Sequence, residues 1–185
     1  KVGKMKNDPA LFSATELIGA YQRKTLSPVE VTKATLARIE KFNPKFNAFR
    51  LVDAEKALAD AKASEERWIK GEPAGLVDGV PSTIKDLVDT IGWSTRRGSL
   101  TTSDNGTWEN DAPLVARLRE NGAVLLGKTT TPEFGWKGVT DSPLTGITRN
   151  PWNPEKTPGG SSGGAAAAAA ACLGALHHGS DGGGS

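Results

Sequence analysis

The sequence predicts an α/β protein in which strands and helices alternate, and three observations support that fold class. Residues 79–84 and 123–126 are each predicted to form a short buried strand. A helix between them is predicted to open at Asp111-Ala112-Pro113 and to close at Asn121-Gly122. A strand, a helix and a second strand in this order favour a sheet with parallel strands.

Three further helices are expected ahead of the first strand. Ser13 and Ser27 each precede a glutamate by three residues, the spacing of a capping box at a helix start. Asn43-Pro44 is expected to end the second helix. The third is predicted over residues 53–70, with Gly71 as its stop. We interpret these helices as a packing layer, and their expected inward residues are Leu17, Ile18 and Tyr21, then Val29, Thr32, Leu36 and Ile39, then Ala54, Leu58 and Ala61.

The remaining segments are expected to alternate between loops and short regular elements. Residues 92–110 are polar and contain glycine, so they are expected to form a loop. Residues 129–157 show little periodicity, and so long an irregular stretch in a compact domain is usually functional or disordered. Residues 165–173 are predicted to be helical, and residues 175–179 to form a third strand. The helix that opens at Pro113 is expected to bury Leu114, Val115 and Leu118.

Composition narrows the classes of function. The chain has 185 residues, of which 37% are hydrophobic and 24% charged, as in an ordinary globular protein. A net charge of +2 gives no support for a nucleic-acid partner, and no apolar run is long enough for a membrane span. Because Cys172 is the single cysteine, an internal disulfide is excluded, and this fits a reducing, cytoplasmic compartment. Cys172 itself is expected to be a small core residue. The chain begins at Lys1 without methionine and stops at a serine, Ser185, that directly follows three glycines. We therefore interpret it as the front part of a longer protein and leave a preceding signal peptide open.

Two glycine-serine runs, 157–164 and 179–185, flank the alanine block 165–171. A phosphate-binding loop is one interpretation, but the pattern Gly-x-x-x-x-Gly-Lys-Ser/Thr is absent and no strand directly precedes Gly159. A flexible linker is a second, and the strongly helical block between the runs disfavours it. The third is a nucleophile site, since a serine beside bare backbone N–H groups suits acyl transfer.

A nucleophilic serine needs a base, and the chain offers histidine or lysine. His177 and His178 are adjacent on an expected strand, so at most one of them faces a given site, and a packed core position is favoured for both. Lys85 stands where a buried strand emerges, and burial lowers the pKa of a lysine toward its proton-accepting form. The competing interpretation of Lys85 is a surface lysine paired with Asp86 or Asp89.

Four blocks of the sequence together resemble the amidase signature family, and the resemblance extends from the N-terminal helices to the last residue. It implies a mixed sheet in an α/β/α sandwich with an N-terminal helical layer. The chain would then be the N-terminal part of one amidase signature domain, with the helical layer over about 10–72 and the start of the α/β core over about 73–185. The four blocks are Gly79-Val80-Pro81…Ile84-Lys85-Asp86, Gly127-Lys128-Thr129…Pro132-Glu133-Phe134-Gly135, Gly159-Gly160-Ser161-Ser162-Gly163-Gly164 and Gly179-Ser180-Asp181-Gly182-Gly183-Gly184-Ser185.

The same resemblance implies a Ser-Ser-Lys triad. Lys85 would be the base, Ser161 the bridging serine and Ser185 the nucleophile that forms an acyl-enzyme. Family members hold the bridging serine in a cis peptide, which here is the bond from Gly160 to Ser161.

The resemblance also assigns the residues around the triad. The backbone N–H groups of Gly182, Gly183, Gly184 and Ser185 would surround the oxyanion, and Ser162 and Asp181 would hold the loops. Gly182 stands where many members carry threonine or another side chain. No metal or cofactor is implied.

The expected function is hydrolysis of a small carboxylic acid amide, in the cytoplasm, with a homodimer left open as the assembly. One alternative within the family is the glutamine-hydrolysing subunit of a tRNA-dependent amidotransferase. An alternative of another class is an inactive fragment with a structural or assembly role. Four tryptophans lie in the irregular segments and are candidates for lining an acyl pocket or for packing in the core. They are Trp93, Trp108, Trp136 and Trp152.

Overall fold

The first part of the chain is helical, as its capping residues predict. Ser13 and Ser27 each form a complete capping box, accepting the N–H of the glutamate three residues on. Asp53 caps the third helix, and Gly71 ends it with a φ of 78°. The computed structural model describes residues 8–106 and 108–185, and this part contains η2 (Pro9–Leu11), α1 (Ala14–Gln22), α2 (Pro28–Phe46) and α3 (Ala54–Lys70).

Two details of these helices differ from the prediction. Helix α2 continues through Pro44 to Phe46, because a proline in the last turn removes only one helical hydrogen bond. The side-chain oxygen of Asn43 also stabilises the helix end, since it accepts the N–H groups of Ala48 and Phe49. In α3 the first-turn residue Ala54 is exposed, and the buried face includes Ala57, Ala61, Ser64 and Trp68.

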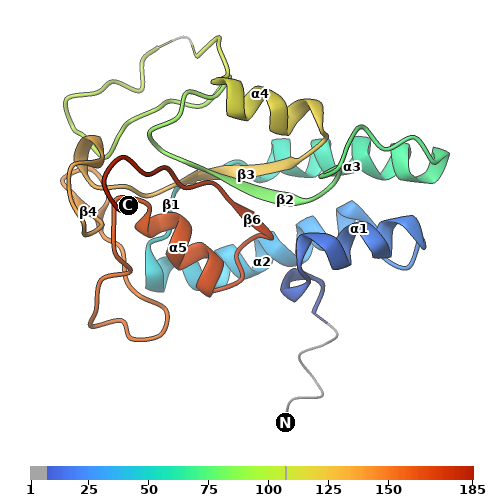
Figure 1. Cartoon of the computed structure of the whole chain (residues 1–185), viewed down its shortest axis with the longest axis horizontal. Coiled ribbons are helices and arrows are strands. Elements are labelled where there is room, and N and C mark those ends of the chain that lie inside the picture. The colour runs from blue at the N-terminus through green and yellow to red at the C-terminus, as the bar shows by residue number, and fades with distance from the viewer. Residues whose placement is uncertain (1–7, 107) are drawn as a thin grey trace.

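Four strands form the main sheet, in the order β1-β3-β2-β6 (Figure 1). The predicted strands β2 (Pro81–Lys85), β3 (Val124–Thr129) and β6 (Leu176–His177) are parallel to one another. Strand β1 (Phe49–Val52) was not predicted and runs antiparallel to β3, which makes the sheet mixed. Its four residues lie directly between two strong helices and are too few for a clear period-2 pattern. They also fall within the range that the sequence assigns to the helical layer.

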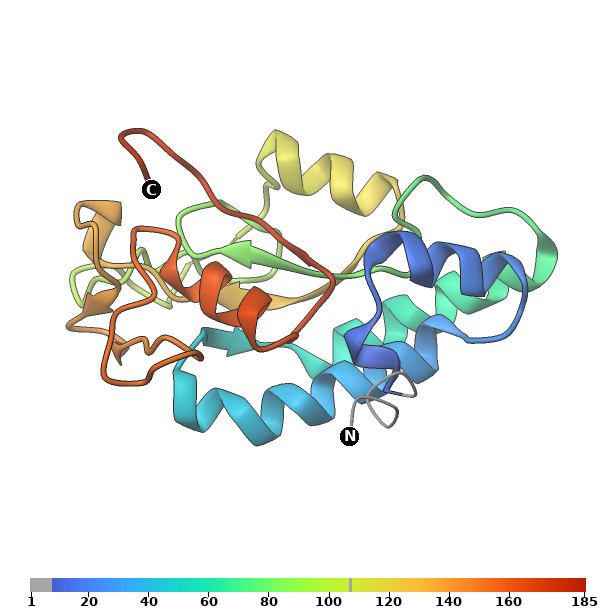
Figure 2. The ribbon, with the colours of Figure 1, turned by 60° about the horizontal axis from the view of Figure 1, so that its bottom comes forward.

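Helices cover both faces of the sheet, so the expected α/β/α architecture is confirmed (Figure 2). Helix α4 (Pro113–Glu120) covers one face, with Val115 packed beside Ile84 and Leu125. Helices α2, α3 and α5 (Gly163–Ala170) cover the other, where Leu126 and Ala168 belong to the larger core cluster. Among the described residues no helix has both the length and the apolar character needed to cross a membrane.

Helix α4 begins and packs differently from the prediction. Its N-cap is Ala112, which offers no side-chain acceptor. Asp111 instead accepts the N–H of Ile91 and forms an ion pair with Arg119 of the same helix. Leu114 is exposed, and Val115 is the residue that the helix buries.

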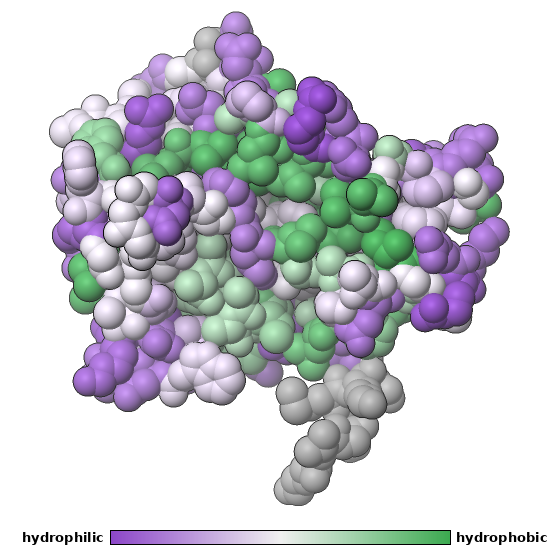
Figure 3. All heavy atoms as spheres, viewed as in Figure 1, coloured by the Kyte–Doolittle hydropathy of each residue, from purple (hydrophilic) through white to green (hydrophobic). Residues whose placement is uncertain are grey.

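The last third of the chain carries less regular structure. The irregular stretch 129–157 contains a 3-10 turn, η3 (Glu133–Gly135), and a two-stranded hairpin of β4 (Asp141–Ser142) and β5 (Gly146–Ile147). Helix α5 starts two residues earlier than expected and ends at Ala170. Strand β6 forms only over Leu176–His177, at the edge of the sheet. Figure 3 shows apolar surface around α5 and β6, where Ala166, Ala169 and Ala170 are exposed.

Candidate active site

Lys85 is fully buried at the end of β2, and its partners are serines. Its Nζ lies within hydrogen-bond distance of Ser161 Oγ (2.7 Å), Ser162 Oγ (2.9 Å) and Ser185 Oγ (3.3 Å). The competing interpretation of a surface lysine paired with a neighbouring aspartate is therefore wrong. Burial lowers the pKa of Lys85, and the nearby charge of Asp181 opposes that shift.

Ser161 stands between the lysine and the last serine. Its hydroxyl lies 2.7 Å from Lys85 Nζ and 2.7 Å from Ser185 Oγ. The peptide bond from Gly160 to Ser161 is cis, as the sequence resemblance implies. The backbone of Gly160 approaches the segment 137–139 so closely that a Cβ would lie 2.7 Å from Val139 N. The chain thus needs glycine at this position.

Ser185 Oγ lies at the N-terminus of α5. It accepts the N–H of Ser161 at 2.7 Å and that of Ser162, the N-cap of α5, at 3.1 Å. Backbone N–H groups at a helix N-terminus carry partial positive charge. They therefore favour the ionised form of the hydroxyl that they contact.

The glycine loop before Ser185 wraps around the side chain of Asp181. The N–H groups of Gly183, Gly184 and Ser185 all donate to Asp181 Oδ1, and these bonds lower the pKa of its carboxyl. Three of the four N–H groups that the sequence assigns to an oxyanion site thus converge on one anionic oxygen. Gly182 is exposed in the same loop.

Two cavities flank Ser185. One, of about 510 Å³, is lined by Trp136, Lys137, Ser161 and the glycine loop. The other, of about 540 Å³, lies against the alanine face of α5 and His177. Trp136 is 87% exposed and is the aromatic side chain of the first cavity.

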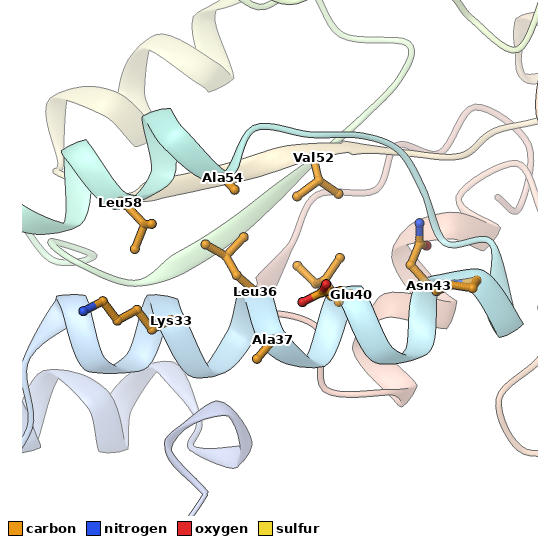
Figure 4. Close-up of a pocket in the computed structure, with 10 residues that line it drawn as sticks. Lys33, Leu36, Ala37, Glu40, Asn43, Val52, Ala54 and Leu58 are labelled. Carbon is orange, nitrogen blue, oxygen red and sulfur yellow. The ribbon is translucent and has the colours of Figure 1, made fainter.

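A larger cavity lies away from the serines. It occupies about 660 Å³ between α2 and the segment from β1 into α3, and Leu36, Val52 and Leu58 give it an apolar lining (Figure 4). Lys33 and Glu40 line it from α2. None of its lining residues belongs to the serine-lysine cluster, so we do not place the chemistry there.

Several residues weighed in the sequence have structural roles. His177 is hydrogen-bonded to Thr83 Oγ1 at 3.0 Å and to Gly174 O at 3.2 Å, and burial lowers its pKa to about 4. Trp93 is buried in the core and donates to Asp53. Trp152 is 86% exposed and lines neither cavity beside Ser185. The remaining three are only half-buried, namely Trp108, Cys172 and His178.

Sequence reasoning assigned no role to two neighbours of the site. Ser180 accepts a hydrogen bond from Lys85 Nζ at 3.1 Å through its hydroxyl. Its place in the same glycine-serine block as Ser185 could have indicated this contact. Lys128 is a second fully buried lysine and the second-last residue of β3, and only its position two residues after the apolar run 123–126 could have indicated it. Among the described residues no group of three or more His, Cys, Asp or Glu is arranged to hold a metal ion.

Comparison with known proteins agrees with this geometry. Residues 30–185 match the profile of the family described as Amidase. The chain is 42% identical to the indoleacetamide hydrolase of Bradyrhizobium diazoefficiens, over 94% of this chain and 33% of that protein. It is 43% identical to a glutamyl-tRNA(Gln) amidotransferase subunit from Salinispora tropica, over 96% of this chain and 36% of that protein.

Solved structures give the same result. A bacterial aryl acylamidase of the amidase signature family superposes with a TM-score of 0.83 at 34% identity, covering 88% of this chain and 34% of its own. The chain thus spans about a third of the length of the relatives that it matches. With the family profile matched over residues 30–185, this chain belongs to the amidase signature family.

Proposed function

We propose that Lys85, Ser161 and Ser185 are the catalytic triad of an amidase that hydrolyses a carboxylic acid amide to an acid and an amine or ammonia. The observation that carries the proposal is the line of contacts from Lys85 Nζ to Ser161 Oγ and on to Ser185 Oγ, each 2.7 Å long. Both distances suit proton transfer along hydrogen bonds. No carboxylate accepts a hydrogen bond from Lys85 in the described residues, which favours a neutral amine.

The proposed reaction begins with neutral Lys85. It takes the proton of Ser161 as Ser161 takes that of Ser185, and Ser185 Oγ attacks the amide carbonyl carbon. The C–N bond of the resulting tetrahedral adduct breaks, and the proton returns through Ser161 to the leaving nitrogen. Water then attacks the acyl-enzyme by the same proton path, which releases the acid and restores Ser185.

The glycine loop would stabilise the oxyanion. In the structure the N–H groups of Gly183, Gly184 and Ser185 already bind an anionic oxygen, that of Asp181. A substrate oxyanion would take these donors together with that of Gly182. Removal of one such donor commonly lowers kcat by about 10²–10³-fold. Ser162 supports the site by holding the two loops together, because its hydroxyl accepts the N–H of Ser180 at 3.2 Å.

The cavity beside Ser185 supports a small amide with an aromatic or alkyl acyl group. Its exposed indole, Trp136, offers a flat apolar face that suits an aryl ring. The similarity to an indoleacetamide hydrolase and to an aryl acylamidase agrees with such a substrate. A small molecule is therefore the partner that we propose. The cytoplasmic location and the homodimer stay predictions.

A second candidate is the amide-hydrolysing component of an amidotransferase that acts on charged tRNA. The 43% identity to one such amidotransferase component supports it, and the triad would serve either activity. Turnover of glutamine that requires co-purifying partner proteins would favour this candidate. Turnover of simple aryl or alkyl amides by the protein alone would favour the amidase.

Labelling by a fluorophosphonate probe tests the proposal, in the full natural polypeptide that carries this sequence. We expect covalent modification at Ser185, located by peptide mass spectrometry, and release of ammonia or amine from a panel of amides. The Ser185→Ala variant should lose both. A folded protein that hydrolyses amides equally well without the Ser185 hydroxyl would refute the triad. A protein with neither activity nor label would favour a purely structural role.

A further inference from the structure

A second buried lysine, Lys128, lies at the end of β3, beside the strand that carries Lys85. Its Nζ donates to the carbonyl of Val88 and to Thr95 Oγ1, the latter at 3.0 Å. It also lies 3.9 Å from a carboxylate oxygen of Asp86. No step of the proposed reaction uses Lys128, and a buried charge of this kind is costly unless it is paired and hydrogen-bonded.

A bulge in β3 directs Lys128 to the α4 face of the sheet. One extra residue of β3 is inserted in the pairing with β2 just before Gly127, and Lys128 then pairs with Ile84. Lys128 therefore shares a face with Ile84, whereas Lys85 points to the opposite face. Gly127 permits the bulge, because its φ is 151° and a Cβ there would lie 2.0 Å from Leu51 O.

Asp86, the residue after Lys85, connects Lys128 to a third charged group. Its carboxylate lies 2.8 Å from Arg50 Nε and accepts Arg50 Nη2 at 3.1 Å. The side chains of Asp86 and Lys128 are at most 1% exposed, and that of Arg50 is 12% exposed. We call Arg50, Asp86 and Lys128 the buried charge cluster.

This cluster is joined to Lys85 by short backbone links. Val88 N donates to the carbonyl of Lys85 at 3.1 Å, and the carbonyl of Val88 accepts Lys128 Nζ. Asp86 N donates to Thr129 O at 3.1 Å, which continues the ladder between β2 and β3 past the end of β2. The peptide group that joins Lys85 to Asp86 is thus held at its carbonyl by Val88, which is bonded to Lys128, and at its N–H by Thr129.

We propose that the buried charge cluster positions Lys85, holding the end of β2 so that Nζ stays within 2.7 Å of Ser161 Oγ. The inference rests on the proposed function of the triad. Lys85 is the last residue of its strand and reaches Ser161 through a long flexible side chain, so its backbone needs an external anchor. Within the described residues the side chains of Arg50, Asp86 and Lys128 make no hydrogen bond to Ser161 or Ser185, so we assign them as positioning residues.

The test is Lys128→Met in the full natural polypeptide. We expect kcat to fall about 10- to 100-fold, as a misplaced catalytic group does, while KM changes by less than about 2-fold. The acidic limb of kcat/KM should move to higher pH, because water that enters a loosened site raises the pKa of Lys85. Lys56→Met is the matched control, since Lys56 is half-exposed on α3 and pairs with Asp60. It should leave kcat and the pH profile unchanged.

A milder variant decides the question if Lys128→Met does not fold, as judged by circular dichroism. Thr95→Val removes one acceptor of Lys128 with little change in shape, and we expect kcat to fall about 3-fold, with a shift of the acidic limb. Its control is Thr35→Val, a buried threonine whose hydroxyl donates to the carbonyl of Val31 within α2. A folded variant of Lys128 or Thr95 with wild-type kcat and pH profile would overturn the inference. Absence of both hydrolysis and Ser185 labelling in the wild type would instead overturn the proposed function.

Discussion

Ser161 and Ser185 are 24 residues apart in the sequence, and their hydroxyl oxygens lie 2.7 Å from each other. The backbone N–H of Ser161 also donates to Ser185 Oγ at 2.7 Å. Ser161 thus holds the last serine through its backbone and contacts it through its side chain. The two contacts can be separated by mutation, because alanine keeps the N–H and removes the hydroxyl.

Ser161→Ala should therefore leave Ser185 oriented but without its proton path to Lys85. We expect kcat to fall about 10²–10⁴-fold, the usual contribution of a positioned acid-base group. Labelling of Ser185 by a fluorophosphonate should slow in parallel, whereas Ser185→Ala should abolish it. Ser142→Ala, at a serine of β4 that contacts Thr145, serves as the control. Wild-type labelling in Ser161→Ala would contradict a relay through this hydroxyl.

Trp136→Ala should change which amides the protein prefers. The indole lines the cavity beside Ser185, so its loss should lower kcat/KM for aryl amides by about 10-fold, which corresponds to about 1.4 kcal/mol of binding. Turnover of acetamide, which has no ring to contact it, should change little. Trp152→Ala is a matched control, because Trp152 is equally exposed and lies outside both cavities. Equal effects on aryl and alkyl amides would argue against an aryl subsite.

Local rules predicted the parts of the fold that depend on local chemistry. The capping boxes at Ser13 and Ser27 and the left-handed stop at Gly71 are short-range patterns, and the structure confirms each. The glycine-serine blocks indicated the residues of the candidate site, because these blocks resemble those of a known family. The cis bond before Ser161, which that resemblance implies, is also present.

The features that sequence reasoning missed depend on pairing between distant segments. Strand β1 exists because Phe49–Val52 lies against β3, and nothing within those four residues requires it. Lys128 is buried because the bulge at Gly127 directs it toward Val88 and Thr95. Neither the bulge nor its partners can be read from local periodicity.

Gly164→Ala should destabilise the fold, although in a helix alanine is normally more favourable than glycine, by up to about 1 kcal/mol. A Cβ on Gly164 would lie 2.4 Å from Thr130 N, and backbone cannot move away as a flexible side chain can. We expect the free energy of unfolding to fall by about 2–3 kcal/mol, measured by urea denaturation. Gly138→Ala, with no atom within 4 Å of its Cβ, should cost much less. Equal stability of the two variants would refute the close approach.

His177 should make the protein sensitive to acid. Burial lowers the pKa of His177 from 6.5 to about 4, so between these values the unfolded chain binds a proton that the folded chain does not. The free energy of unfolding should therefore fall as pH drops from about 6.5 to 4, by roughly 3 kcal/mol from this residue. His177→Gln, which cannot titrate, should flatten that part of the curve of unfolding free energy against pH. An unchanged slope in the variant would assign acid sensitivity to other groups.

Asp181 and Lys85 give a prediction for the pH dependence of catalysis. Burial lowers the pKa of Lys85, and the negative charge of Asp181 partly restores it. Since the neutral amine is the proposed base, kcat/KM should rise with pH through the pKa of folded Lys85. Asp181→Asn removes the opposing charge, so the pKa should fall further and the acidic limb should move to lower pH.

The position of that limb, rather than the size of kcat, is the informative quantity. Asparagine keeps an oxygen that can accept the N–H groups of Gly183, Gly184 and Ser185, but it binds them less strongly than a carboxylate. The rate in Asp181→Asn thus reflects both the loop and the lysine, whereas the limb reflects the lysine alone. Asp60→Asn, on α3, should leave the limb in place. A limb that stays fixed or moves to higher pH in Asp181→Asn would mean that the titrating base is not Lys85.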